Sequence, residues 1–148
     1  VERRPLALWQ RKNELVLVDE NGDVITPRKL DRFHKMLVLV GKDAPAHATA
    51  LLSILSREPD LKHRVNAAVR VGDRRWNIRM DNGVYVRLPE NDALEAWRRF
   101  ARLERKHKLL KQDLLSIDLR IPDQLIVRTR GGRPEKDRKV SHRKGKNT

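Results

Sequence analysis

The chain has 148 residues, no cysteine, and an aromatic content of only 4%. The absence of thiols excludes disulfide bonds and thiolate metal sites. No apolar run approaches the roughly 20 residues that a membrane-spanning helix needs, and no secretory signal opens the sequence. Because the first residue is Val1 and not methionine, we expect the chain to be a fragment of a longer protein.

Signatures of catalysis and of cofactor binding are also missing. There is no phosphate-binding glycine loop and no paired-histidine zinc motif. The histidines are scattered, which is typical of surface or boundary positions: His34, His47, His63, His107 and His142. Asp118 and Arg120 lie two positions apart in a predicted strand, so we interpret them as a surface charge pair and not as an acid or base. The sequence therefore predicts no enzymatic activity, no cofactor and no metal.

Positive charge dominates the composition. Lys and Arg number 34 against 20 Asp and Glu, which gives a net charge of +14. Such a charge favours nucleic acid, anionic lipid or acidic protein partners. Residues 131–148 contain seven basic residues but one aliphatic residue, Val140, so we predict a disordered basic tail. A basic nucleic-acid-binding module is one hypothesis, although only His142 in this tail could stack on bases.

The stretch from Arg75 to Leu88 predicts the centre of the fold. Apolar residues at positions 76, 78 and 80 alternate with polar ones, which is the period of a half-buried strand. Asn82-Gly83 then predicts a tight turn in which both residues adopt positive φ. The alternation resumes at positions 84, 86 and 88. We therefore predict a hairpin with one apolar face, and this face requires a cover.

Other strands and two helices complete the predicted architecture. Alternation and apolar runs predict strands at 6–10, 15–19, 24–26, 37–40, 65–71, 114–121 and 125–130. Helical spacing predicts helices at 43–56 and 92–111. Asp43 is expected to cap the first helix and Pro59 to end it. In the second helix, Trp97 and Phe100 are expected to cover the hairpin while the arginines face water. The fold class is α+β, a mostly antiparallel sheet with both helices on one face and the tail beyond it.

Three motifs in this order resemble the FtsQ/DivIB family of bacterial cell-division proteins. The pattern Trp76-x-x-x-x-Asp81-Asn82-Gly83-x-x-x-x-Leu88 is similar to a tryptophan, asparagine and glycine motif of that family. The opening residues 1–9 are similar to the sequence segment that links the family's POTRA domain to its C-terminal β domain. Residues 117–120, Ile-Asp-Leu-Arg, are similar to the family's Val-Asp-Leu-Arg-Tyr. The resemblance covers nearly all of residues 1–130.

The resemblance implies a domain organisation and a function. Residues 1–5 would end a POTRA domain, residues 1–130 would form the C-terminal β domain, and 131–148 would be the tail. A cytoplasmic segment, an inner-membrane helix and the POTRA domain would precede Val1. The region shown would lie in the periplasm at the division septum. There it would serve as a non-enzymatic scaffold that recruits the FtsB–FtsL pair through a sheet edge.

The final predicted strand is the expected partner-binding site. It ends the folded part, so we expect it at a sheet edge whose backbone groups are open to an added strand. The resemblance indicates the same region. It implies the partner-binding residues Arg120, Ile121, Leu125, Ile126, Val127, Arg128 and Thr129. Ile121 stands where the family has tyrosine, and Thr129 stands where it commonly has an aromatic residue.

Overall fold

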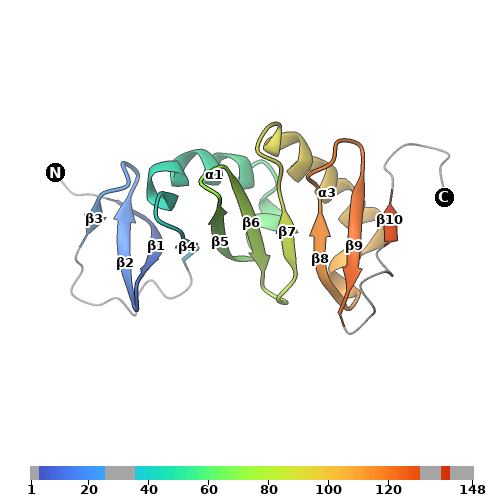
Figure 1. The fold of residues 1–148 in the computed structure, drawn as a ribbon, viewed down its shortest axis with the longest axis horizontal. Coiled ribbons are helices and arrows are strands. Elements are labelled where there is room, and N and C mark those ends of the chain that lie inside the picture. The colour runs from blue at the N-terminus through green and yellow to red at the C-terminus, as the bar shows by residue number, and fades with distance from the viewer. Residues whose placement is uncertain (1–3, 26–35, 131–137, 141–148) are drawn as a thin grey trace.

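The computed structural model describes residues 4–25, 36–130 and 138–140. Its strands form a single sheet in the order β10-β9-β8-β7-β6-β5-β4-β1-β2-β3 (Figure 1). The strands are β1 (Pro5–Arg11), β2 (Glu14–Asp19), β3 (Val24–Ile25), β4 (Val38–Val40), β5 (Val65–Val71), β6 (Arg75–Met80), β7 (Tyr85–Arg87), β8 (Leu114–Asp118), β9 (Leu125–Thr129) and β10 (Arg138–Val140). The helices are η2 (Ala44–His47), α1 (Ala48–Leu55), α2 (Pro59–Lys62), α3 (Ala93–His107) and η3 (Leu109–Lys111).

The two longer helices determine where the sheet is parallel. Strands β4 and β5 are parallel because α1 connects them, and β7 and β8 are parallel because α3 connects them. A parallel pair needs such a crossover, whereas short turns join antiparallel strands. Strands β1 and β4 form the third parallel pair, and the other neighbouring pairs are antiparallel. The predicted α+β class with a mostly antiparallel sheet is therefore confirmed.

The hydrophobic core lies between one face of the sheet and the helices. Trp76 is 6% exposed, and Ile78 and Met80 are fully buried, as the alternation in the hairpin predicts. Trp97 and Phe100 of α3 are also fully buried, and their rings lie 5.7 Å apart in a tilted arrangement. The indole N–H of Trp97 donates to the carbonyl oxygen of Leu55 at 3.3 Å, which ties α3 to α1. The predicted cover of the hairpin is confirmed.

The hairpin turn differs from its prediction at Asn82. Gly83 has a φ of +90°, but Asn82 is not among the residues with positive φ, so the expectation for Asn82 is wrong. The loop is a three-residue connection in which only Gly83 adopts the left-handed region. Asn82 stabilises the turn with two side-chain hydrogen bonds. Its amide N–H donates to the carbonyl oxygen of Leu110 at 2.8 Å, and its Oδ1 accepts from the N–H of Val84 at 3.2 Å.

The helix ends also differ from their predictions. Asp43 makes no capping hydrogen bond, and its carboxylate instead lies 3.4 Å from Nε of Arg70 and 3.3 Å from Nε2 of His47. Pro59 opens the one-turn helix α2. The predicted second helix is interrupted at Lys108, whose φ is +52°. The left-handed backbone of Lys108 therefore ends α3 inside the range that the sequence pattern predicts as one helix.

The structure describes the two ends of the chain only in part. Residues 1–3, 26–35, 131–137 and 141–148 lie outside the described residues, and so do most of the predicted tail and its proposed boundary. Within the tail, Arg138–Val140 form β10 and pair with β9. Across the described residues, none of the helices has both the length and the apolar character needed to span a bilayer.

Candidate partner-binding edge

The turn between β8 and β9 presents the first two predicted site residues. Leu119 is buried and its N–H donates to the carbonyl oxygen of Arg87 at 3.0 Å, which extends the β7–β8 pairing. Arg120 and Ile121 then leave the sheet, and Ile121 is 46% exposed. The N–H of Gln124 closes the turn on the carbonyl oxygen of Ile121 at 3.2 Å. The turn therefore holds an exposed aliphatic side chain in a fixed position next to the sheet.

A buried arginine holds this turn against α3. Arg99 is 5% exposed, and its Nη2 donates to the carbonyl oxygens of Leu119 at 3.4 Å and Gln124 at 3.3 Å. Burial lowers the pKa of Arg99 below its usual value, and the charges of Glu95 and Asp123 partly offset this effect. The expectation that the arginines of this helix face water is therefore wrong for Arg99. Arg99 lies three residues after Ala96 and four before Leu103, which are both buried, so helical spacing was a signal for its burial but not for its two acceptors.

Asp118 and Arg120 form the predicted surface charge pair. Two hydrogen bonds join the Arg120 guanidinium to the Asp118 carboxylate, at 2.9 Å from Nε and 2.7 Å from Nη2. Burial raises the pKa of Asp118, but the hydrogen bonds from Arg120 outweigh it, so the pKa lies below the ordinary value of 3.8. The same hydrogen bonds raise the pKa of Arg120. A partner carboxylate would therefore share Arg120 with Asp118.

The side chains of β9 alternate between the core and the helix-free face. Leu125 and Val127 are buried in the core, whereas Ile126, Arg128 and Thr129 are half-buried. A partner strand could therefore reach Leu125 and Val127 only through their backbone. Ile126 and Arg128 present side chains on the face that the helices do not cover.

The backbone directions of β9 follow from one hydrogen bond. The N–H of Arg130 donates to the carbonyl oxygen of Asp113 on the β8 side at 3.0 Å. Since backbone groups alternate along a strand, residues 126 and 128 also face β8. The groups of Leu125, Val127 and Thr129 face the opposite, outer side. The irregularity in this pairing lies between Leu114 and Ser116 on β8, so it leaves the alternation within β9 intact.

Strand β10 occupies part of that outer side. It pairs antiparallel with β9 in the register Arg138↔Val127, Lys139↔Ile126 and Val140↔Leu125. The expectation that the final predicted strand lies at an open sheet edge is therefore wrong along Leu125–Val127. Among the described residues, this pairing does not extend to Arg128 or Thr129. This pairing was not foreseen because residues 138–140 contain one aliphatic residue, so no periodic pattern marks a strand.

A shallow hollow adjoins the turn. It has a volume of about 460 Å³ and lies between the start of α3 and the β8–β9 turn; Arg99, Leu119 and Arg120 line it together with Glu90, Asp92, Glu95 and Asp123. Acidic side chains therefore surround the buried Arg99 and the exposed Arg120. Among the described residues, no group of three or more His, Asp or Glu side chains is arranged to hold a metal.

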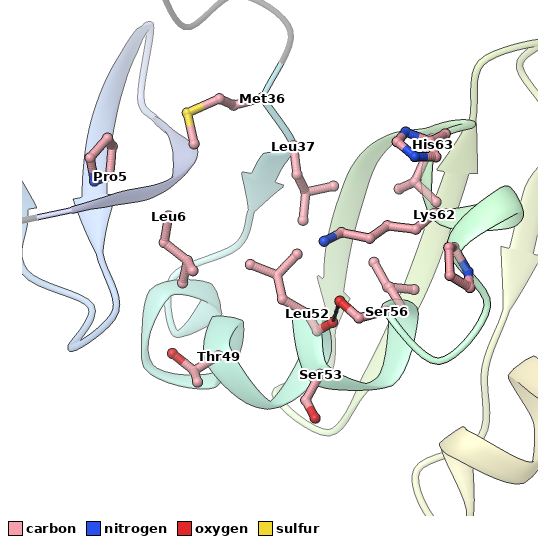
Figure 2. A pocket seen from close by; sticks show the side chains of 13 residues that line it. Pro5, Leu6, Met36, Leu37, Thr49, Leu52, Ser53, Ser56, Lys62 and His63 are labelled. Atoms are coloured by element: carbon pink, nitrogen blue, oxygen red, sulfur yellow. Dashed lines mark hydrogen bonds between the residues drawn. The ribbon is translucent and has the colours of Figure 1, made fainter.

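A larger groove lies toward the other end of the sheet. Its volume is about 800 Å³, and α1 and α2 border it together with β1, β5 and the two residues before β4. Figure 2 shows the side chains of Leu6, Leu37 and Leu52 converging on it, with Lys62 reaching across one end. None of the predicted partner-binding residues lines this groove. The sheet order separates it from β9 by β6, β7 and β8.

Comparisons with known proteins find relatives of this chain. The family "Cell division protein FtsQ/DivIB, C-terminal" matches residues 7–120. Cell division protein FtsQ of Rhizobium meliloti is 39% identical over 126 residues, which cover 85% of this chain and 41% of that protein. The corresponding protein of Bradyrhizobium diazoefficiens is 38% identical over 126 residues, covering 85% and 37%. That of Rhizobium radiobacter is 35% identical over 135 residues, covering 91% and 64%.

The chain thus spans less than two thirds of the length of these relatives. The extracytoplasmic domain of the cell-division protein DivIB from Geobacillus stearothermophilus aligns with a TM-score of 0.49 at 14% identity, covering 74% of this chain and 97% of that one. The family match covers most of the folded sheet, from β1 to the turn after β8. The chain belongs to the FtsQ/DivIB family of cell-division proteins and carries its C-terminal region.

Proposed function

We propose that this chain is the extracytoplasmic interaction module of a non-enzymatic division scaffold. In this role it recruits the FtsB–FtsL pair to the septum, on the periplasmic side of the inner membrane. Family membership supports the role in division. The partners and the location come from the family resemblance. The position and register of β9 support the proposed mode of binding.

In this proposal an extended segment of FtsB adds to the outer side of β9. The backbone groups of Leu125, Val127 and Thr129 provide hydrogen bonds that demand little of the partner's sequence. Ile121 provides an apolar contact at the turn, and Ile126 and Arg128 provide side-chain contacts on the helix-free face. Arg120 interacts with a partner carboxylate beside Asp118.

The observation that carries the proposal is an exposed aliphatic residue on the turn that leads into β9, a strand whose outer side only the short strand β10 covers among the described residues. Outward backbone groups of β9 lie beside β10, which pairs with three residues of β9 within the part of the chain that the structure describes. Ile121 is 46% exposed on the turn that precedes β9. Arg128 and Arg130 are also typical of an edge strand that has no partner, so the exposed Ile121 is the feature that favours binding. A strand-forming partner with one apolar side chain fits these features.

Thr129→Pro tests the proposal. The N–H of Thr129 points outward and lies beyond the described residues of β10, and its side chain is only half-buried. Proline there removes a donor for the partner and disturbs the core less than it would at a buried position of β9. Proline is tolerated on edge strands where the N–H faces away from the sheet. Binding of a fluorescent FtsB segment should weaken by about five- to tenfold, as expected for the loss of one hydrogen bond. Anisotropy titration measures the change, and circular dichroism verifies the fold.

Thr129→Val is the matched control because it keeps both the N–H and the β-branched shape. It should bind as the unmodified chain does. Val127→Pro also removes an outward donor, but the Val127 side chain is only 1% exposed, so that variant would disturb the core as well. If a folded Thr129→Pro variant binds the segment with unchanged affinity, the partner binds elsewhere on the chain. As a second control, an FtsB segment with a scrambled sequence and equal charge measures nonspecific attraction to the basic chain.

A further inference from the structure

We propose that β10 is a built-in competitor for the partner site, so that a partner strand must displace it to reach β9. This inference rests on the proposed function, in which the partner adds to the outer side of β9. Strand β10 pairs with Leu125, Ile126 and Val127 on that side. The outward groups of Leu125 and Val127 cannot pair with both strands at once.

The register defines which backbone groups the two strands would contest. Because Leu125 and Val127 face outward, they form the hydrogen-bonded pairs with Val140 and Arg138. Ile126 and Lys139 are then the non-hydrogen-bonded pair. The N–H groups of residues 138 and 140 therefore face β9, whereas that of Lys139 faces away from it.

The sequence of β10 makes it a weak occupant. It has three residues, Arg138-Lys139-Val140, of which one is aliphatic and two are basic. It therefore brings positive charge to an edge that already carries Arg128 and Arg130. A longer partner segment with acidic residues would pair with more of β9 and would relieve this repulsion. The occupant that displaces β10 is thus an extended acidic-apolar peptide segment.

The tether makes β10 an effective competitor in spite of this weakness. Only eight residues, 130–137, separate β9 from β10 in the sequence. A short connection gives an attached strand an effective concentration on the order of millimolar. The apparent affinity of the partner then falls by the fraction of molecules in which the edge is free. Coverage in nine molecules of ten would weaken binding about tenfold.

Val140→Pro in the full chain tests this competition. Proline removes an N–H that faces β9 and leaves the charge of the chain unchanged. The FtsB segment should bind about tenfold tighter if β10 covers the edge in nine molecules of ten. Val140→Thr, which keeps the N–H and the branched shape, should bind as the unmodified chain does. Unchanged or weaker binding by Val140→Pro would overturn the inference, because it would show that β10 does not block the site.

A reversible disulfide bond between β9 and β10 tests the opposite case, in which β10 cannot leave β9. The chain has no cysteine, so the double variant Ile126→Cys, Lys139→Cys has one possible intramolecular disulfide. The two residues form the non-hydrogen-bonded pair, whose Cα separation of about 4.5 Å suits a disulfide. Both forms lack the Ile126 contact, so the reduced form sets the reference affinity, and the oxidised form should bind at least about tenfold more weakly than it. Equal binding by both forms would overturn the inference.

Amide exchange separates failure of this inference from failure of the proposed function. The amides of Leu125 and Val127 should exchange slowly in the unmodified chain without partner and faster in Val140→Pro. Suppose that fast exchange of the Leu125 and Val127 amides in Val140→Pro shows that β10 has left β9, but no variant binds the segment. The proposed partner site is then wrong, and so is the inference that β10 competes for it. If all variants bind equally, the partner site stands and only the role of β10 is wrong.

Discussion

Arg99 of α3 donates a hydrogen bond to the carbonyl oxygen of Gln124 at 3.3 Å, although 25 positions separate the two residues in the chain. A second bond from the same nitrogen reaches the carbonyl oxygen of Leu119 at 3.4 Å. These two acceptors lie at the two ends of the turn that carries Arg120 and Ile121. One buried guanidinium therefore fixes the turn that presents the proposed apolar anchor.

Replacement of Arg99 by methionine should loosen this turn. Methionine keeps much of the side-chain volume but removes both donors, so two carbonyl groups lose their partner. We expect a loss of about 1–2 kcal/mol in unfolding free energy and faster exchange of the Gln124 amide. Chemical denaturation and hydrogen exchange measure the two effects. Arg98→Met, on the neighbouring residue, is the control, and equal effects of the two variants would contradict the assigned role.

Trp76→Ala should be among the most destabilising substitutions in the sheet. The indole is 6% exposed, and the Arg70 guanidinium lies 5.1 Å from its ring centroid. Truncation leaves a cavity in the core and should cost about 3–5 kcal/mol. Urea denaturation followed by circular dichroism measures the loss. A cost below about 1 kcal/mol would show that the core closes around the missing ring.

Asn82→Ala should destabilise the domain more than Asp81→Ala. The Asn82 amide donates to the carbonyl oxygen of Leu110 at 2.8 Å and connects the hairpin turn to η3. Its loss should cost about 1–2 kcal/mol. Asp81 forms an ion pair with Arg64 whose two side chains are both more than one third exposed, so its contribution is small. Equal melting temperatures for the two variants would contradict this ranking.

Asp118 should make stability depend on acid pH. Its pKa in the folded state lies below the ordinary value of 3.8 because Arg120 donates to it. The pair therefore stabilises the fold above that ordinary value, and this contribution is lost as the pH falls through the lower folded pKa. The difference in unfolding free energy between the unmodified chain and Asp118→Asn should be constant near pH 7 and disappear in strong acid. A difference that grows on acidification would reverse the assigned sign.

Truncation after Arg130 should leave the domain folded. The deleted segment contributes β10, which pairs with three residues of β9 and whose sequence has one aliphatic residue. We expect the melting temperature to fall by no more than about 2–4 °C, which corresponds to roughly 1 kcal/mol in a chain of this size. Differential scanning calorimetry measures the change. A fall of more than about 10 °C would show that this segment belongs to the core structure.

Local patterning by itself determined most of the elements and the composition of the core. The alternation through Trp76, Ile78 and Met80 fixes the buried face of β6, because a strand places every second side chain on the same side. The spacing of Trp97 and Phe100 likewise fixes the face of α3 that covers the sheet. The sequence also predicted the pair of Asp118 and Arg120, although Arg120 follows the end of β8 and reaches Asp118 from the turn and not from the same strand.

Only the tertiary structure decided the roles that depend on contacts between distant residues. Arg99 is buried because the turn after β8 supplies carbonyl groups for it, and no feature of its helix predicts that turn. Asn82 bonds to Leu110, 28 positions away, and therefore has no need of the positive φ that its sequence context suggested. Strand β10 forms through backbone pairing with β9, and backbone groups are the same at every residue, so no side-chain pattern could reveal it.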